Sequence, residues 1–261
     1  MKRGGLLPGK GFSLVELLIA MALGLMLTLG VLQVFLASKE SFVLQQRSAA
    51  MQENARFLLG RLAQDIRQAG QFGCLDLRRL PASSRVTVPA ELAVPVSYQN
   101  GVLRMISALP VSADVSVPGD VFSAADFAAR WLVVTNCLDS LQVSEADTPL
   151  TVQSGDVLIP LRLLEYRHRD QRIQVRSNGK GNFETLIEGV ADFTLAFGLA
   201  ADTQAHGVTG AYQTSLAVAD APRIRSIRLA LLLSEQPAAK SQDGMQTQGY
   251  VQVTAVRNRL D

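Results

Sequence analysis

Residues 11–17 of the chain read Gly11-Phe12-Ser13-Leu14-Val15-Glu16-Leu17. The leader that ends at Gly11 contains three basic side chains, Lys2, Arg3 and Lys10, and no acidic one. Residues 17–38 then carry no charged side chain. A helix over that stretch, at about 1.5 Å per residue, is roughly 33 Å long and can cross a bilayer. The basic residues before it predict a cytoplasmic N-terminus, with the bulk of the chain on the other side of the membrane.

An ordinary cleaved secretory signal fits this stretch less well. The apolar part of such a signal is about 7–15 residues long and precedes a small-x-small cleavage site. Here the apolar stretch is longer, Glu16 interrupts its start, and Phe35-Leu36-Ala37 is a poor cleavage site. We therefore expect the mature protein to keep this helix.

Apolar side chains keep a helical spacing well beyond residue 38. Steps of three and four residues define one stripe, at Met51, Ala55, Leu58, Leu62, Ile66 and Ala69. Much of the other face is assigned to polar side chains: Lys39, Gln45, Arg47, Gln52, Glu53, Arg61, Gln64, Asp65 and Arg67. Gly70 stands where a glycine commonly ends a helix. The pattern predicts one helix from about Ser13 to Ala69, with its second half packed on a globular domain.

After Gly70 the sequence changes to short β-type runs with turn signals. Residues 94–98 and 102–106 flank Asn100-Gly101, which is typical of a hairpin, and Pro95 favours an edge strand. Further strands are expected at 131–135, 157–163, 171–176, 190–199, 227–233 and 250–256. Two runs show one-sided alternation: Val157, Ile159, Leu161, Leu163, and Ile227, Leu229, Leu231, Leu233. Residues 200–221 and the polar stretch 236–249 are expected to be loops, and the topology of residues 76–150 stays open. The fold class is α+β, a long helix on a mostly antiparallel sheet.

Several segments resemble one family of the type IV pilin superfamily. Gly11-Phe12 followed by Glu16 resembles the prepilin motif. Gln52-Glu53-Asn54-Ala55-Arg56, running on to Asp65-Ile66-Arg67-Gln68-Ala69-Gly70 and Phe72-Gly73-Cys74, resembles minor pilins of the PilW family and the related J-type pseudopilins. Further similar segments are 164–167, 186–193, 224–231 and 256–259. The membrane half lacks the proline that major pilins usually carry, which favours a minor subunit.

The resemblance implies a type IV pilin-like fold and a processing step. A prepilin peptidase would cut between Gly11 and Phe12 and methylate the new amine of Phe12. The domains would be a cleaved leader at 1–11, a transmembrane and assembly half-helix at 12–38, and a periplasmic head at 39–261. The head would consist of an amphipathic helix at 39–69 and a β-rich domain at 70–261.

Glu16 is the residue to which we assign assembly, together with Phe12. A carboxylate at mid-bilayer costs on the order of 2.5–3.5 kcal/mol, and less near the membrane edge, so such a group is usually paired. Cleavage creates a positive amine on Phe12, one helical turn from Glu16. In a fibre, Glu16 can bind the Phe12 amine of a neighbouring subunit instead. The alternative is a glutamate that only reaches to the membrane edge.

The resemblance also implies a function and partners. The chain would join other minor pilins and the major pilin in a priming complex that initiates pilus assembly and ends near the tip, supporting twitching motility and surface attachment. A PilY-type tip adhesin, the prepilin peptidase and the inner-membrane assembly platform would be partners. The protein would lie in the inner membrane and then in the fibre of a Gram-negative bacterium. Two alternatives stay open: a J-type pseudopilin of type II secretion, and a pilin whose head binds DNA or a host ligand.

The soluble part offers little other chemistry. Cys74 and Cys137 are read as a possible disulfide, with two free buried thiols as the alternative. No metal site, cofactor or enzyme motif is predicted, and His168 and His206 are single and far apart. Removing the leader lowers the net side-chain charge from +2 to −1. A charge this close to zero does not favour nucleic-acid binding. Five arginines surround one predicted hairpin and are read as solvated strand faces, with a docking surface as the alternative: Arg162, Arg167, Arg169, Arg172 and Arg176.

Overall fold

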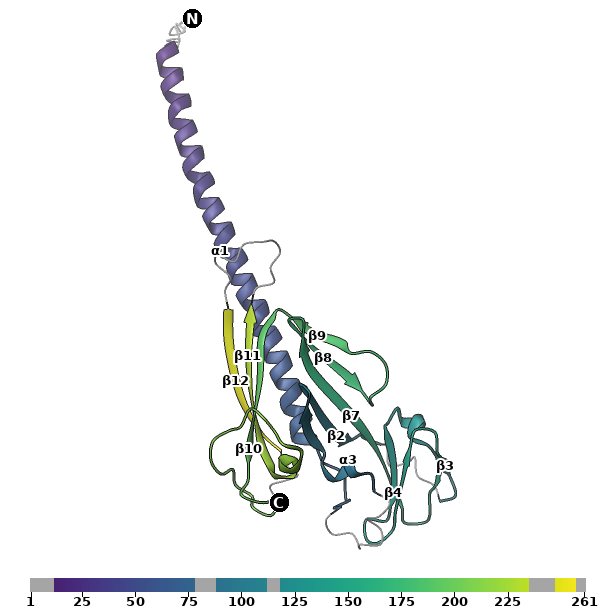
Figure 1. Ribbon diagram of the computed structural model, residues 1–261. Coiled ribbons are helices and arrows are strands. Elements are labelled where there is room, and N and C mark those ends of the chain that lie inside the picture. Colours follow the sequence, from purple (N-terminus) through teal and green to yellow (C-terminus); the bar gives the residue numbers. More distant parts are fainter. Residues whose placement is uncertain (1–11, 78–87, 112–117, 235–246, 257–261) are drawn as a thin grey trace, which may run out of the picture. The chain divides into compact units, whose positions relative to one another are not determined.

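The computed structural model describes residues 12–77, 88–111, 118–234 and 247–256. It divides into two units, Met1–Ala50 and Met51–Asp261. Helix α1 runs from Leu14 to Gln68 through 55 residues (Figure 1), which confirms the predicted helix to within one residue at each end. Gly70 follows it with a φ of 76°, a conformation that ends helices at little steric cost.

The first unit, as far as it is described, is the N-terminal half of α1. Its long apolar side chains are exposed throughout, from Phe12 at 85% to Phe42 at 66%. By length and composition this half can cross a membrane, and none of its most apolar window is buried by the protein itself. Lipid or neighbouring subunits would cover such a surface, because an apolar patch of this size is unstable in water.

Burial on α1 begins at Met51. The six stripe residues predicted from the sequence are all at most 7% exposed, and Leu59 and Ala63 widen the stripe. The assignment of Asp65 to the polar face was wrong, because Asp65 is 6% exposed and faces the sheet. Asp65 follows Leu58 and Leu62 in steps of four and three residues, so its position also belongs to the buried stripe.

The larger sheet has seven strands, all paired antiparallel. Its main order is β1-β2-β7-β4-β5, and β8 and β9 extend it from β7. The bounds are β1 Val96–Gln99, β2 Val102–Ala108, β4 Trp131–Thr135, β5 Leu141–Glu145, β7 Val157–Arg169, β8 Arg172–Ser177 and β9 Glu184–Glu188. The Asn-Gly hairpin is confirmed: Asn100 and Gly101 have φ of 52° and 74°, as a type I′ turn requires. Strand β1 lies at the edge, directly after Pro95.

Strand β7 is the long central strand, and the predicted face of Ile159, Leu161 and Leu163 is confirmed, while Val157 is an exception. Alternation over Val157–Leu163 predicted one buried face, but Val157 is 45% exposed while Leu158 is 5% exposed. The reason is that two apolar clusters cover the two faces of this half of β7. Leu158 packs with Leu132 and Val134. Ile159 and Leu161 pack with Trp131 and Val133 on the other face.

The second sheet has the order β10-β11-β12. Its strands are β10 Val190–Leu199, β11 Ile224–Ser234 and β12 Thr247–Ala255. The predicted inward face Ile227, Leu229, Leu231, Leu233 is confirmed, with each residue at most 2% exposed. The loop predicted at 236–249 needs correction, because Thr247 to Gly249 belong to β12; residues 236–246 lie outside the described part.

Short elements make up the rest of the helices and strands in the described part of the head. They are helix α3 Ala90–Ala93, the 3-10 turns η2 Ala124–Phe127 and η3 Val218–Arg223, and the two-stranded pair β3 Val121–Phe122 with β6 Leu150–Thr151. Most of the predicted loop 200–221 is confirmed, with η3 at its end. The second half of α1 runs alongside both sheets (Figure 1). Leu58 and Leu62 share one apolar cluster with Tyr166 of β7 and Phe197 of β10.

Candidate functional site

The N-terminal residues assigned to processing and assembly lie at the start of α1. Gly11 and the rest of the leader lie outside the described residues. Phe12 is 85% exposed, and Glu16 falls in the first turn of the helix. The amide of Leu17 donates to the carbonyl of Ser13 at 3.2 Å, so helical geometry starts within one residue of Phe12. A new amine on Phe12 would therefore lie about one turn from the Glu16 carboxylate, on a rod with no other charge before Lys39.

Cys74 and Cys137 form a disulfide in the structure, with Cα atoms 5.8 Å apart. The bond ties the segment that follows α1 to the turn between β4 and β5. That turn is ordered locally, because the Asn136 side-chain oxygen accepts hydrogen bonds from the amides of Leu138 and Ser140, both at 3.0 Å. The disulfide thus joins the segment after α1 to a turn that its own hydrogen bonds hold in place.

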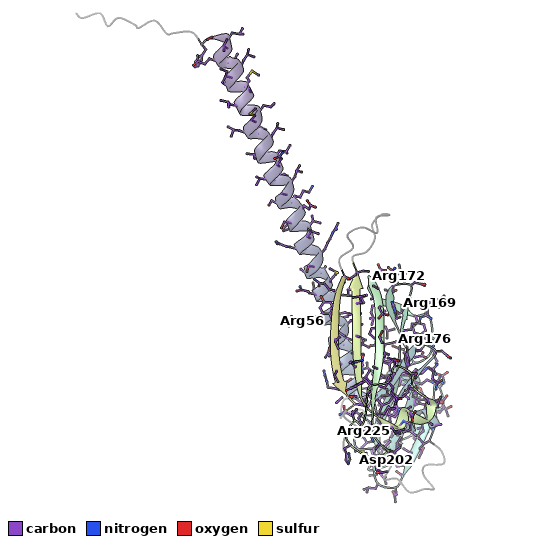
Figure 2. All side chains as sticks on the ribbon, turned by 60° about the vertical axis from the view of Figure 1, so that its left-hand side comes forward. Arg56, Arg169, Arg172, Arg176, Asp202 and Arg225 are labelled. Carbon is purple, nitrogen blue, oxygen red and sulfur yellow. A yellow bond between two sulfur atoms is a disulfide. The ribbon has the colours of Figure 1, made fainter. Side chains whose placement is uncertain are left out.

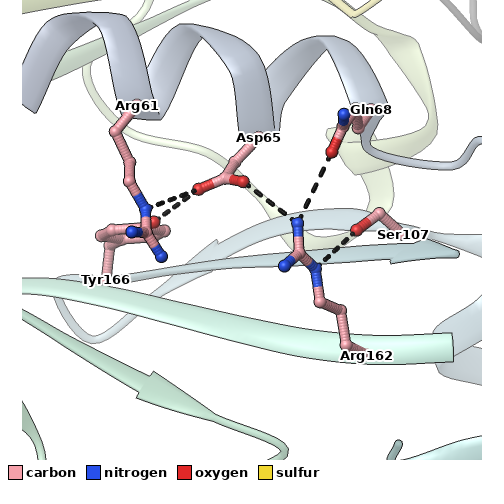
Figure 3. A network of polar contacts seen from close by, with 6 residues as sticks. All are labelled: Arg61, Asp65, Gln68, Ser107, Arg162 and Tyr166. Carbon is pink, nitrogen blue, oxygen red and sulfur yellow. Dashed lines mark hydrogen bonds and ion pairs between the residues drawn. The ribbon is translucent and has the colours of Figure 1, made fainter. Parts of the chain in front are cut away.

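A buried carboxylate on α1 holds the helix to the large sheet (Figure 3). The hydroxyl of Tyr166 donates to Asp65 Oδ2 at 2.5 Å, and Arg162 Nη2 lies 3.3 Å from Asp65 Oδ1. Arg61 Nε lies 3.7 Å from the same carboxylate. Arg162 Nε also donates to Ser107 Oγ at 3.2 Å. Arg162 and Tyr166 are four residues apart on β7, and alternation of a strand places both on the face toward α1.

This network connects two of the segments on which the family resemblance rests. Asp65 begins the Asp65–Gly70 segment at the end of α1, and Tyr166 lies in the Leu164–Arg167 segment of β7. Sequence reasoning missed the contact because Asp65 was assigned to the polar face of the helix together with Arg61. The position of Asp65 on the apolar stripe could have predicted this contact. A carboxylate on a buried face needs a polar or charged partner, which here must come from the element packed against the helix.

We expect Asp65→Ala to lower the free energy of unfolding of the head by about 2–3 kcal/mol, because it leaves the buried Tyr166 hydroxyl without an acceptor and Arg162 without its ion pair. Fluorescence of Trp131, the only tryptophan and 1% exposed, reports unfolding of the full-length chain in detergent. Glu53→Ala, at an exposed position of the same helix, is the control and should change little. A loss as small as that of Glu53→Ala would mean that the network does not stabilise the head.

Tyr166 gives the same network a pH dependence. Burial, and then the charge of Asp65 and the hydrogen bond to it, raise the pKa of the Tyr166 phenol well above its ordinary value. A raised folded-state pKa gives stability that is present below the unfolded pKa of about 10 and is lost as the pH rises above it. The stability gap between wild type and Tyr166→Phe should therefore shrink by about 1.4 kcal/mol per pH unit above pH 10. A gap that stays constant from pH 8 to pH 11 would exclude this coupling.

The five arginines do not form one solvated patch. Arg162 points to α1, and Arg176 lies 2.6 Å from the buried carboxylate of Glu165 on the opposite face of β7. Arg172 pairs with Glu188 at 3.1 Å and Arg169 with Asp170 at 3.5 Å. Arg167 donates to Gln174 at 2.8 Å. Figure 2 shows Arg169, Arg172 and Arg176 near one end of the strands.

Arg225 is a further buried group that sequence reasoning missed. It is 2% exposed, and its guanidinium donates to the carbonyls of Ala205 at 2.8 Å, Thr203 at 2.9 Å and Pro222 at 3.1 Å. It lies beside Asp202 (Figure 2). Backbone amides of Ala205 and Gln204 lower the pKa of the Asp202 carboxyl. The arginine thus fixes the loop that follows β10 by binding its backbone.

The two histidines are separate. His168 Nε2 lies 3.0 Å from the Val190 carbonyl, while His206 is exposed in the loop after β10. Within the part of the chain that the structure describes, no three His, Cys, Asp or Glu side chains are placed to hold a metal ion.

Comparisons with known proteins match two parts of this chain to family models. Residues 162–259 match the family model for type IV pilus-assembly protein W, and residues 9–32 match the prokaryotic N-terminal methylation motif. A type IV-like pilin from Thermus thermophilus is similar at 12% identity and a TM-score of 0.41, over 81% of this chain and 97% of that one. The comparison with curated proteins gave no match. The matched regions contain Glu16 and Tyr166, and in these two regions the chain is similar to type IV pilus-assembly protein W and to proteins with an N-terminal methylation motif.

Proposed function

We propose that this chain is an assembly subunit that helps to initiate type IV pili. The leader, residues 1–11, is removed between Gly11 and Phe12, and Phe12 is methylated. The mature chain joins other minor pilins and the major pilin in a priming complex that ends near the fibre tip. The observation that carries the proposal is a lone carboxylate, Glu16, in the first turn of an apolar helix whose exposed side chains need a lipid or protein partner.

The physical mechanism is pairing of charges in a low-dielectric surrounding. While the subunit is in the membrane, its own Phe12 amine neutralises Glu16. During assembly Glu16 exchanges this amine for that of a neighbouring subunit. At ~4 Å and an effective dielectric constant of ~20 the attraction is of order 4 kcal/mol before desolvation is subtracted. The charge pair sets the register, while the leucine and valine side chains of α1 supply non-directional packing.

The proposal includes a location and partners. The mature N-terminus faces the cytoplasm, residues 12–38 lie in the inner membrane, and the head, residues 39–261, lies in the periplasm until the subunit enters the fibre. The assembly platform and a PilY-type tip adhesin are the proposed partners, and twitching motility and surface attachment are the outputs. The role is assembly, not catalysis.

Deletion of the gene in its own bacterium tests this role. We expect fewer surface pili and reduced twitching, both restored by the wild-type chain. Intact mass of the membrane form should correspond to a chain that starts at N-methylated Phe12. Normal piliation together with a defect in the secretion of folded proteins would show a J-type pseudopilin instead, and a chain that keeps residues 1–11 in the cell would contradict the processing step.

A further inference from the structure

The face of β7 that points away from α1 carries a second buried carboxylate. Arg104 of β2, Glu165 of β7 and Arg176 of β8 stand directly opposite one another in the registers of three adjacent strands. Arg104 Nε donates to Glu165 Oε1 at 3.1 Å, and Arg176 Nε donates to Oε2 at 2.6 Å. The Glu165 side chain is only 2% exposed. One carboxylate therefore holds two guanidinium groups, one from each side.

This triad leaves hydrogen-bonding capacity unused. A guanidinium has five N–H donors, and Glu165 takes one from each arginine. The terminal nitrogens of Arg104 and Arg176 have no hydrogen-bond partner among the described residues, and these side chains are 48% and 26% exposed. Buried ion pairs add little to the stability of a fold. We therefore read the main effect of Glu165 as holding the two arginine side chains in a fixed orientation.

An aromatic ring packs against two arginines on this face of the sheet, Arg176 and Arg167. The ring of Phe183 lies 4.5 Å from the Arg176 guanidinium and 3.8 Å from that of Arg167. Arg167 is held further by its bond to Gln174. Arg104, Arg176 and Arg167 are therefore preorganised, so little side-chain entropy would be lost when they bind a ligand.

The triad lies in a cleft of about 500 Å³, a volume typical of ligand sites. Among the lining residues are Glu91 of α3, Ser97 and Gln99 of the edge strand β1, Arg104, Glu165 and Gly179. Gly179 has a φ of 66°, and a Cβ built there would lie 3.9 Å from Glu165 Oε2. The loop after β8 thus closes over the carboxylate, while the terminal nitrogens of the two arginines stay accessible.

We propose that this cleft binds carboxylate side chains of an acidic, extended peptide segment of a partner protein. The planar forks of Arg104 and Arg176 match a carboxylate, which binds arginine through two parallel hydrogen bonds. Ser97 and Gln99 add polar side chains beside them. A saccharide fits less well, because Trp131, which lines the cleft, is 1% exposed, and Tyr98 is half-buried and packs on Phe197. The proposal goes beyond the assembly role, and binding can be measured without a pilus.

The first experiment uses the full-length chain in detergent and a fluorescein-labelled hexapeptide of alternating glutamate and glycine. The same peptide with glutamine is the control ligand and should bind at least about tenfold more weakly. Arg104→Lys keeps the charge but loses the fork, and should weaken binding of the acidic peptide by about tenfold. Arg169→Gln, at a 65% exposed side chain outside the cleft, should change nothing. Equal binding of the two peptides, or an equal loss in Arg169→Gln, would overturn the proposal.

The Glu165→Gln variant tests whether binding depends on the orientation of Arg104 and Arg176 or only on the positive charge of the cleft. The variant raises the positive charge of the cleft, so unspecific attraction predicts tighter binding. Loss of the oriented pair predicts weaker binding, by at least about fivefold. Trp131 fluorescence checks folding, and Arg104→Lys decides the question if Glu165→Gln does not fold. Tighter binding of the acidic peptide by Glu165→Gln would show a general anion surface and would refute the peptide site. The same conclusion would follow if inorganic phosphate or a DNA oligonucleotide, at the same concentration of negative charge, displaced the labelled peptide as well as unlabelled acidic peptide does.

Discussion

Glu16→Ala is expected to leave peptidase cleavage intact and to reduce the amount of this chain in sheared pili by at least about tenfold. The reason is that the substitution removes the only charged side chain between the leader and Lys39. With it goes the proposed attraction to a neighbouring subunit's amine, of order 4 kcal/mol before desolvation is subtracted. The apolar side chains of α1 remain, so insertion into the membrane should be unchanged. Immunoblots of sheared fibres and of membranes measure both pools.

The matched control is Glu40→Ala, at an exposed glutamate on the same half of α1 but past the uncharged stretch. This variant should enter fibres like the wild type. Intact mass confirms that each variant begins at residue 12. Equal recovery of Glu16→Ala and wild type from sheared fibres would contradict the proposed role of the carboxylate.

Removal of the disulfide should have the largest effect on the stability of the head. Cys74 and Cys137 are separated by 63 residues in sequence, and closing such a loop lowers the entropy of the unfolded chain, which corresponds to about 4 kcal/mol in the chain-entropy model. We expect the double substitution Cys74→Ser, Cys137→Ser to lower the free energy of unfolding by about that amount. Urea unfolding of the full-length chain in detergent, followed by Trp131 fluorescence, measures the change.

A reducing agent provides the internal control for this effect. It should shift the unfolding midpoint of the wild type toward that of the double variant, and it should leave the double variant unchanged. Thiol titration of the unfolded, non-reduced wild type should detect no free thiol. Two titratable thiols per chain in protein purified from cells would mean that the pair is not oxidised in cells.

The long helix and the hairpin could be predicted because local signals determine them. Apolar steps of three and four residues and Gly70 set the course and end of α1, and Asn100-Gly101 sets one turn. The buried polar groups could not be predicted in this way. Asp65 and Tyr166, or Arg104 and Glu165, lie far apart in the sequence, and their pairing depends on which strands are neighbours. The burial of Leu158 could not be predicted for a related reason, since two clusters bury both faces of β7 in its first half.

Adjacent residues of β7 take part in two networks that each contain a buried carboxylate. Tyr166 faces Asp65 on one side, and Glu165 faces two arginines on the other. Because neighbouring side chains of a strand point in opposite directions, a shift by a single residue would exchange the two faces. The carboxylate of Glu165 would then confront that of Asp65, and the phenol would be placed among guanidinium groups. Like-charge repulsion therefore adds a penalty against misaligned strands to the one that apolar side chains already impose.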